Sequence, residues 1–205
     1  MTNLYWLCKN SALVASKILF GFSARGLDKI PKSGAFIIAP NHQSYLDPPF
    51  LGAITPREIH FFAKAELFKV FGLGLVIRNL NAFPVRRGVY DPAAISMALA
   101  ALEKGHGLLI FPEGTRDNGE AFLPAKPGIG MIAKRSGAQI VPAYLYRSHK
   151  IWGALLARRH MKIVFGEPIP ADAVARHSDD REGYQAIADE VLTRIGALKN
   201  SYFPD

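Results

Sequence analysis

A histidine and an aspartate stand five residues apart, just after a short apolar run. The run, Ala35–Ala39, predicts a buried strand, and it leads into His42 and then Asp47. On an uninterrupted helix this spacing would place the two side chains ~140° apart. Pro48 disfavours helical geometry at the residue before it, so a single turn can bring the Asp47 carboxylate to the His42 imidazole. We also expect Asp47 to cap the helix that begins at Pro48.

A histidine paired with an aspartate can act as a general base. An aspartate that holds one ring nitrogen leaves the other able to take a proton, and the ordinary histidine pKa of ~6.5 suits that task near neutral pH. The alternative is that Asp47 is only a helix cap and His42 only a loop residue. Ser44 lacks the Gly-x-Ser-x-Gly turn of a nucleophile, and the other histidines lack ligand spacing. We therefore expect neither a serine nucleophile nor a metal site.

A second apolar run also ends in chemically interesting residues. Gly107–Phe111 predicts a strand, and the residues after it read Pro112-Glu113-Gly114-Thr115-Arg116. A turn with exposed backbone N–H groups and one arginine suits an anion, because a guanidinium group binds phosphate oxygens two at a time.

The elements that must position these residues alternate along the chain. Strands and helices in alternation predict a single α/β domain with a mixed, mostly parallel sheet flanked by helices. The expected strands, besides a short strand or turn at 25–30, are 35–39, 58–63, 82–85, 108–111, 139–145 and 161–165; the expected helices are 48–54, 66–71 as one or two turns, 92–104, 128–136 and 181–199.

Composition narrows the class of protein. The 205 residues are 49% hydrophobic and 20% charged, which excludes a disordered chain. A single cysteine excludes a disulfide framework and a cysteine-based zinc site. The net charge of +8 points to an anionic partner, such as nucleic acid, a phosphorylated metabolite, an anionic lipid surface or an acidic carrier protein.

The N-terminal residues predict an amphipathic helix rather than a membrane span. Polar residues interrupt the apolar run 4–22, which fits neither a spanning helix nor a secretory signal. Leu7, Val14, Ile18 and Phe22 form one stripe, with Lys9 and Lys17 expected near its edge. We expect residues 1–24 to be an anchor helix on the membrane surface and 25–205 to form the catalytic domain. A first helix packed on the core is the alternative.

Together the two motifs resemble those of the glycerolipid acyltransferase family, with the bacterial 1-acyl-sn-glycerol-3-phosphate acyltransferases as the nearest pattern. The matching blocks are Asn41-His42-x-x-x-x-Asp47, Ala82–Gly88, Phe111–Arg116 and Ile140–Ala143, with further similarity around Lys64 and Lys126. The resemblance runs from about Gly26 to Gly166, in the expected order.

The resemblance implies direct acyl transfer without a cofactor or metal. His42 and Asp47 would be catalytic, with Lys64 or backbone N–H groups near Gly114 stabilising the oxyanion. Binding of substrate is implied for Arg87, Glu113, Gly114, Thr115, Arg116 and Lys126, and the phosphate of the acceptor would lie on Arg87 and Arg116. The donor would be acyl-CoA or acyl carrier protein, and the acceptor a lysophospholipid.

Other functions stay open at this point. The same chemistry could act on a lyso-ornithine lipid, another lysophospholipid or glycerol-3-phosphate, or the fold could be a non-catalytic lipid-binding module. The basic and aromatic stretch 147–162 predicts contact with an anionic membrane surface, and its alternative is an exposed loop. No nucleic-acid motif is present, so nucleic acid is not expected. The expected location is the cytoplasmic face of the inner (plasma) membrane, with monotopic or peripheral attachment.

Overall fold

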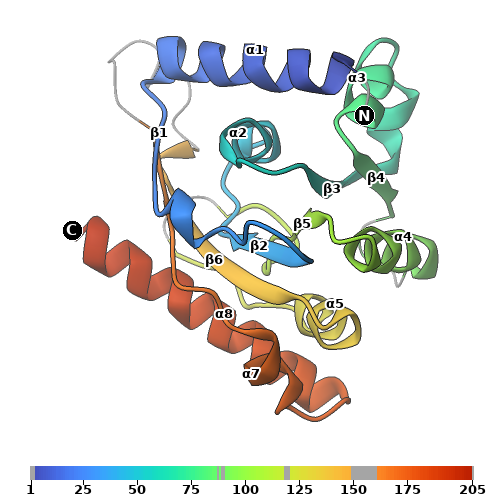
Figure 1. The fold of residues 1–205 in the computed structure, drawn as a ribbon, viewed down its shortest axis with the longest axis vertical. Coiled ribbons are helices and arrows are strands. Elements are labelled where there is room, and N and C mark those ends of the chain that lie inside the picture. The colour runs from blue at the N-terminus through green and yellow to red at the C-terminus, as the bar shows by residue number, and fades with distance from the viewer. Residues whose placement is uncertain (1–2, 87, 89–90, 118–120, 149–160, 205) are drawn as a thin grey trace.

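Seven strands form one sheet in the computed structural model, which describes residues 3–86, 88, 91–117, 121–148 and 161–204 (Figure 1). Neighbouring strands follow the order β1-β7-β6-β2-β5-β3-β4, and every pair is parallel except β6 with β7. This confirms the mixed, mostly parallel sheet. The strands are β1 (Ser23–Arg25), β2 (Phe36–Pro40), β3 (Ile59–Lys64), β4 (Ala82–Val85), β5 (Gly107–Leu109), β6 (Gln139–Tyr146) and β7 (Lys162–Phe165).

Helices cover both faces of this sheet (Figure 1). Two of them, α3 and α7, were not expected from the sequence, because each is too short to show a clear apolar period. The described helices are α1 (Asn3–Phe20), α2 (Asp47–Ile54), α3 (Leu73–Asn79), α4 (Pro92–Glu103), α5 (Gly128–Ser136), α7 (Ala171–Ala175) and α8 (Arg181–Tyr202), with 3₁₀ turns η1 (Leu27–Lys29) and η2 (Ala65–Lys69).

The core lies on the two sides of the central strand β2. Successive side chains of a strand point to opposite faces. Ile37 and Ala39 therefore pack with residues of α4, α5 and α8, whereas Phe36 and Ile38 pack with residues of α2. All five residues of β2 are buried, which is why this strand reads as a continuous apolar run rather than an alternating one.

The topology brings the two chemical motifs to the same edge. β2 and β5 are parallel neighbours, so the loops that follow them both leave from the carboxyl edge of the sheet. β3 and β4 end at this edge as well. Ligands of α/β proteins collect at such an edge.

The N-terminal helix α1 lies outside α2 (Figure 1), and three residues of the predicted stripe are exposed. Leu7, Val14 and Ile18 are 64%, 55% and 77% exposed. The expectation for Lys9 was wrong, because it lies on the opposite, inward face and its Nζ donates to the carbonyl of Thr55 at 2.6 Å. Phe22 also leaves the stripe and is buried, because the helix ends before it at Gly21, where φ is +56°.

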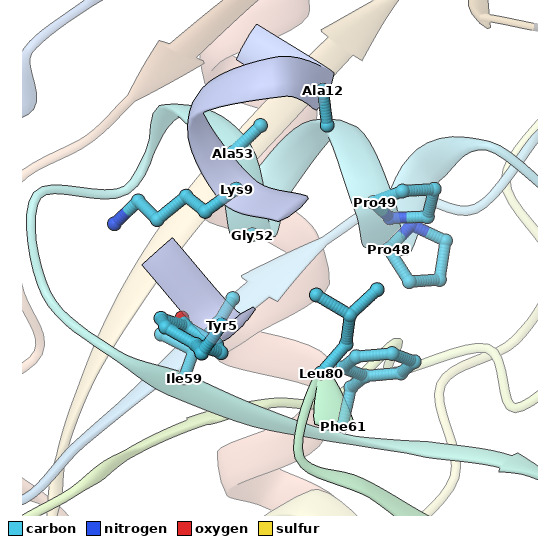
Figure 2. A pocket seen from close by; sticks show the side chains of 10 residues that line it. All are labelled: Tyr5, Lys9, Ala12, Pro48, Pro49, Gly52, Ala53, Ile59, Phe61 and Leu80. Atoms are coloured by element: carbon cyan, nitrogen blue, oxygen red, sulfur yellow. The ribbon is translucent and has the colours of Figure 1, made fainter. Parts of the chain in front are cut away.

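Figure 2 shows how α1 sits on the domain. Tyr5 and Lys9 of α1, together with residues of α2 and β3, line an apolar cavity of about 30 Å³, which is far too small for an acyl chain. Burial raises the pKa of Tyr5 to about 12 and lowers that of Lys9. None of the described helices is long and apolar enough to cross a membrane. The division at residue 24 into anchor and domain stays a prediction, and most of the 147–162 stretch (residues 149–160) lies outside the described residues.

Candidate active site

The imidazole of His42 and the carboxylate of Asp47 meet just beyond the end of β2. The distance between His42 Nδ1 and Asp47 Oδ2 is 2.9 Å, and both side chains are almost completely buried. Since Nδ1 is held by Asp47, Nε2 is the ring nitrogen left for a substrate. His42 also lines the cleft described below. The pair therefore has the geometry of an oriented general base.

Asp47 does not cap the helix, contrary to the expectation. It is the first residue of α2, and its side chain turns back toward the loop, where Oδ2 accepts hydrogen bonds from the backbone N–H groups of Gln43 and Ser44 at 2.8 Å each. The backbone N–H of Asp47 donates to the Ser44 carbonyl, which closes the single turn that was expected. One carboxylate oxygen thus fixes both the loop and the imidazole.

Glu113 connects the loop that follows β5 to the loop that follows β2. Its carboxylate accepts hydrogen bonds from the backbone N–H of His42 at 3.1 Å and from that of Leu123 at 2.7 Å. It is fully buried, and burial raises its pKa to about 7, although the two hydrogen bonds act in the opposite direction. A further bond runs from the Asp117 N–H to the His42 carbonyl. Glu113 therefore holds the backbone that carries the histidine.

Asn41 fixes the other side of the same loop. Its side chain accepts a hydrogen bond from the Leu145 N–H at 2.7 Å and donates to the Leu145 carbonyl at 3.2 Å. This reciprocal pair links the end of β2 to β6 one residue before His42. Sequence reasoning assigned Asn41 no role, because its partner lies 104 residues away.

Two aromatic rings complete the surroundings of the pair, and the sequence reasoning missed both. Phe111 stacks on His42, with ring centroids 3.8 Å apart. Tyr45, 66% exposed, lies under the guanidinium group of Arg116, whose Cζ is 3.5 Å from the ring centroid. The aromatic residue types at these positions were the only signal available in the sequence.

A cleft of about 270 Å³ opens beside His42. Its described lining is mainly apolar, and two cationic side chains, Arg86 and Lys126, stand among the lining residues. The others are Phe62, Val85, Gly88, Leu109, Ile110, Phe111, Pro112, Gly114, Gly128, Ile129 and Ile132.

The structure brings some of the expected site residues together and not others. Lys126 lines the cleft beside Gly114, whereas Thr115 and Lys64 are exposed and lie outside its described lining. The backbone N–H of Gly114 donates to the Phe111 carbonyl at 3.0 Å, so in this conformation it is engaged and cannot bind an oxyanion. Arg87 lies outside the described residues, and its neighbour Arg86 is the described arginine that lines the cleft.

Fold and site together define an α/β protein with an oriented histidine at the carboxyl edge of its sheet, a class suited to removing a proton from a bound substrate. The sequence profile of the Acyltransferase family matches residues 21–146. The chain belongs to this family and is an acyltransferase.

Individual relatives cover most of the chain. A 1-acyl-sn-glycerol-3-phosphate acyltransferase of Bacillus subtilis is 31% identical over 96% of this chain and 98% of its own length. A lyso-ornithine lipid O-acyltransferase of Pseudomonas aeruginosa is 30% identical over 89% of this chain and 75% of its own. The crystal structure of the acyltransferase PlsC from Thermotoga maritima superposes with a TM-score of 0.75 at 27% identity, over 95% of this chain and 79% of that one.

Proposed function

We propose that this chain transfers a fatty acyl group from acyl-CoA or acyl carrier protein to the sn-2 hydroxyl of lysophosphatidic acid, giving phosphatidic acid. The observation that carries the proposal is the buried pair of His42 and Asp47 in a cleft with apolar walls. The relative from Bacillus subtilis, which aligns with nearly the whole chain, suggests this acceptor by its name.

The proposed reaction is a single acyl transfer. Nε2 of His42 takes the proton of the acceptor hydroxyl as its oxygen attacks the thioester carbonyl. The carbon–sulfur bond then breaks, and the imidazolium returns the proton to the leaving thiolate. Ester and thiol are the products, so no co-reactant is needed. Asp47, 2.9 Å from Nδ1, stabilises the positive charge while the histidine carries the proton.

The lining of the cleft supports an acyl chain as one of its ligands. Phe62, Val85, Ile129 and Ile132 offer hydrocarbon surface within the same cleft as His42. Binding there would place the thioester at the end of a buried chain, next to the base, and so fix its orientation before attack.

The cations at the edge of the sheet support an anionic acceptor. Arg116 and, by the family resemblance, Arg87 would hold the phosphate, and the turn Gly114–Thr115 would shape that subsite with Lys126 beside it. Because the Gly114 N–H is engaged, the oxyanion needs another donor, and Lys126, whose side chain lies beside Gly114 in the cleft, is a candidate. Lys64 stays a candidate for this role, and Glu113 supports the loop rather than touching substrate.

The acceptor is a lipid, so we place the enzyme at a membrane surface. The exposed stripe of Leu7, Val14 and Ile18 on α1 is suited to lie in the outer part of a bilayer. Both proposed donors are found in the cytoplasm, and the attachment we propose is therefore peripheral or monotopic, on the cytoplasmic face of the inner (plasma) membrane.

A lyso-ornithine lipid is the second candidate acceptor, favoured by the relative from Pseudomonas aeruginosa. Its hydroxyl would react in the same way, but it has no phosphate to occupy the arginines. The two acceptors therefore differ in how much they should depend on Arg116.

The test is a transfer assay with purified protein in detergent micelles. Labelled acyl-CoA and labelled acyl-acyl carrier protein would each be offered as donor. The acceptor would be lysophosphatidic acid, a lyso-ornithine lipid or glycerol-3-phosphate. We expect phosphatidic acid as the main product and a loss of at least about 10²-fold in kcat for His42→Ala, while its unfolding temperature stays near that of the wild type.

Each other outcome would point elsewhere. A higher kcat/KM with the lyso-ornithine lipid would identify that lipid as the acceptor. No product with any pair of donor and acceptor would favour a binding module. Retention of most activity by His42→Ala would show that His42 is not the general base. His177→Ala is the matched control, since His177 lies between α7 and α8, outside the described lining of the cleft, and pairs with Glu190.

A further inference from the structure

The segment between β3 and β4 exposes an unusual amount of apolar side chain. Phe71 is fully exposed, and Leu75 is 67% exposed. Three more large apolar residues of the same segment, Val70, Leu73 and Val76, are exposed between 41% and 50%. We call these five residues the 70–76 surface. Scattered exposed apolar residues are ordinary, but five within seven positions form a patch of the kind that marks a contact site.

The segment is held in place, so its exposure belongs to the folded state. A Cβ on Gly74 would lie only 2.3 Å from the Phe68 carbonyl oxygen, which shows how closely α3 packs on η2. Arg78 places its guanidinium group over the Phe68 ring. Ile77 and Leu80 pack inward against the core. The inward face of α3 is therefore already packed against the rest of the protein.

The outward side of α3 exposes three large apolar residues, Leu73, Leu75 and Val76, with Arg78 also exposed on this helix. A contiguous apolar patch of this kind marks a site of contact with a partner or with lipid. The described part of the chain covers only the inner side of α3. The 70–76 surface is therefore suited to contact with an apolar partner or phase.

The charged residues around the 70–76 surface indicate what it contacts. Lys64, Lys69 and Arg78 are exposed on the same segment, and Glu66 is the one acidic residue between 64 and 79. Cations that border an apolar surface are suited to the phosphates of an anionic bilayer. A second copy of this chain is disfavoured as the occupant, because the chain carries a net charge of +8 and two copies repel each other.

The 70–76 surface lies on a segment that is connected to the site and is close to α1. The segment follows Lys64, the last residue of β3, so it leaves from the sheet edge that carries His42. Leu80, which follows α3, and Tyr5, near the start of α1, line the same small cavity (Figure 2). In Figure 1, α3 lies next to the N-terminal end of α1.

We propose that the 70–76 surface inserts into the outer part of an anionic bilayer, as a second contact beside α1 that holds the mouth of the cleft at the membrane. This deepens the proposed function, because it states how a lipid acceptor reaches the site. Phe71 and Leu75 supply the apolar contact, and Lys69 supplies the contact to phosphate.

Vesicle binding of the full chain tests the proposal. The partition coefficient would be measured by sedimentation with vesicles of 30% phosphatidylglycerol in phosphatidylcholine and with phosphatidylcholine alone. We expect Phe71→Ser/Leu75→Ser to lower it about tenfold or more. Tyr202→Ser, which removes a 46%-exposed aromatic from α8, should change it less than twofold. Double-variant binding within twofold of the wild type would overturn the proposal.

The electrostatic part has its own pair of variants. Lys69→Glu should weaken binding several-fold on the anionic vesicles and hardly at all on phosphatidylcholine. Lys32→Glu makes the same charge change before β2, at the opposite edge of the sheet, and should have a smaller effect. Equal losses for the two variants would mean that only net charge matters and would contradict the placement of the surface.

A direct probe keeps the proposal testable if the double variant folds poorly. In a Cys8→Ala background, Phe71→Cys would carry a polarity-sensitive fluorophore, and Tyr202→Cys would carry the same label as the control. We expect a blue shift on anionic vesicles for position 71 alone. No shift there would refute insertion, and so would self-association of the wild type, measured by sedimentation velocity, that Phe71→Ser abolishes.

Transfer activity in detergent micelles separates this proposal from the proposed function. There Phe71→Ser/Leu75→Ser should keep kcat within about twofold of the wild type, because a micelle delivers the lipid without docking. An inactive wild type would refute the acceptor or the reaction, whereas the vesicle measurements would still decide the surface.

Discussion

The guanidinium group of Arg116 lies on the ring of Tyr45, with its Cζ 3.5 Å from the ring centroid. This contact joins the loop after β5 to the loop after β2, so each of the two motifs contributes one partner. A cation over an aromatic face is attracted by about 0.5–1 kcal/mol at an exposed site. Tyr45 therefore holds the arginine that is proposed to bind the phosphate.

We expect Tyr45→Ala to raise the KM for lysophosphatidic acid several-fold with a smaller change in kcat, because Arg116 would lose its support but not its charge. Arg116→Ala should raise the KM further. Steady-state kinetics in micelles measures both. Tyr45→Phe, which keeps the ring, is the control and should behave like the wild type; a defect as large as that of Tyr45→Ala would assign the effect to the hydroxyl.

Asp47→Asn should lower kcat by about 10²–10⁴-fold while the KM values change little. The amide oxygen can still accept the N–H groups of Gln43 and Ser44, but a neutral side chain no longer stabilises the protonated His42. Single-turnover measurements would follow the chemical step. A variant with more than a tenth of wild-type kcat would show that the carboxylate charge is dispensable.

Asn41→Ala should destabilise the fold by about 2–4 kcal/mol, because it leaves the buried N–H and carbonyl of Leu145 without partners. Urea unfolding measures the change in the free energy of unfolding. Asn79→Ala is the control, since its side chain makes one exposed hydrogen bond, to Leu75, and should change stability by less than about 1 kcal/mol. Similar losses for both variants would contradict the anchoring role.

Glu113 should make stability fall as the pH rises. Its pKa is raised from an ordinary value near 4.5 to about 7, so the folded protein binds the proton more tightly than the unfolded chain does. The stability from this group is fully present below about pH 4.5 and is lost as the pH rises through 7, by at most about 3 kcal/mol.

Thermal unfolding at pH 5.5 and pH 8 tests this for the wild type and for Glu113→Gln. The Gln variant should be less stable, because one of its two backbone bonds is lost, and it should depend less on pH over that interval. An equal pH dependence of the two proteins would assign the titration to another group.

Much of the site could be predicted because its partners are close in sequence. His42 and Asp47 meet across one turn, and Pro48 signals where that turn ends. The fold class was readable for a similar reason, since apolar runs alternate with helix signals along the chain.

Contacts between distant segments could not be predicted. Asn41 binds Leu145 and Glu113 binds the N–H of His42, at separations of 104 and 71 residues. On α1, Leu7, Val14 and Ile18 are exposed, and their role in an amphipathic stripe stays a prediction. Lys9 was expected near the edge of that stripe but is buried, because it binds the carbonyl of Thr55, 46 residues away. The catalytic and binding roles of the site residues, Lys64, Arg87 and Thr115 among them, remain predictions.

By itself, the sequence determined that a histidine and an aspartate can meet beyond a buried strand, and that a basic, single-domain α/β chain carries them. Local spacing and proline geometry suffice for that. The tertiary structure decided that the Gly114 N–H is engaged, that Tyr45 holds Arg116, and that the 70–76 surface faces outward. Such features depend on which strands are neighbours, and strand order follows from the packing of the whole chain rather than from any one segment.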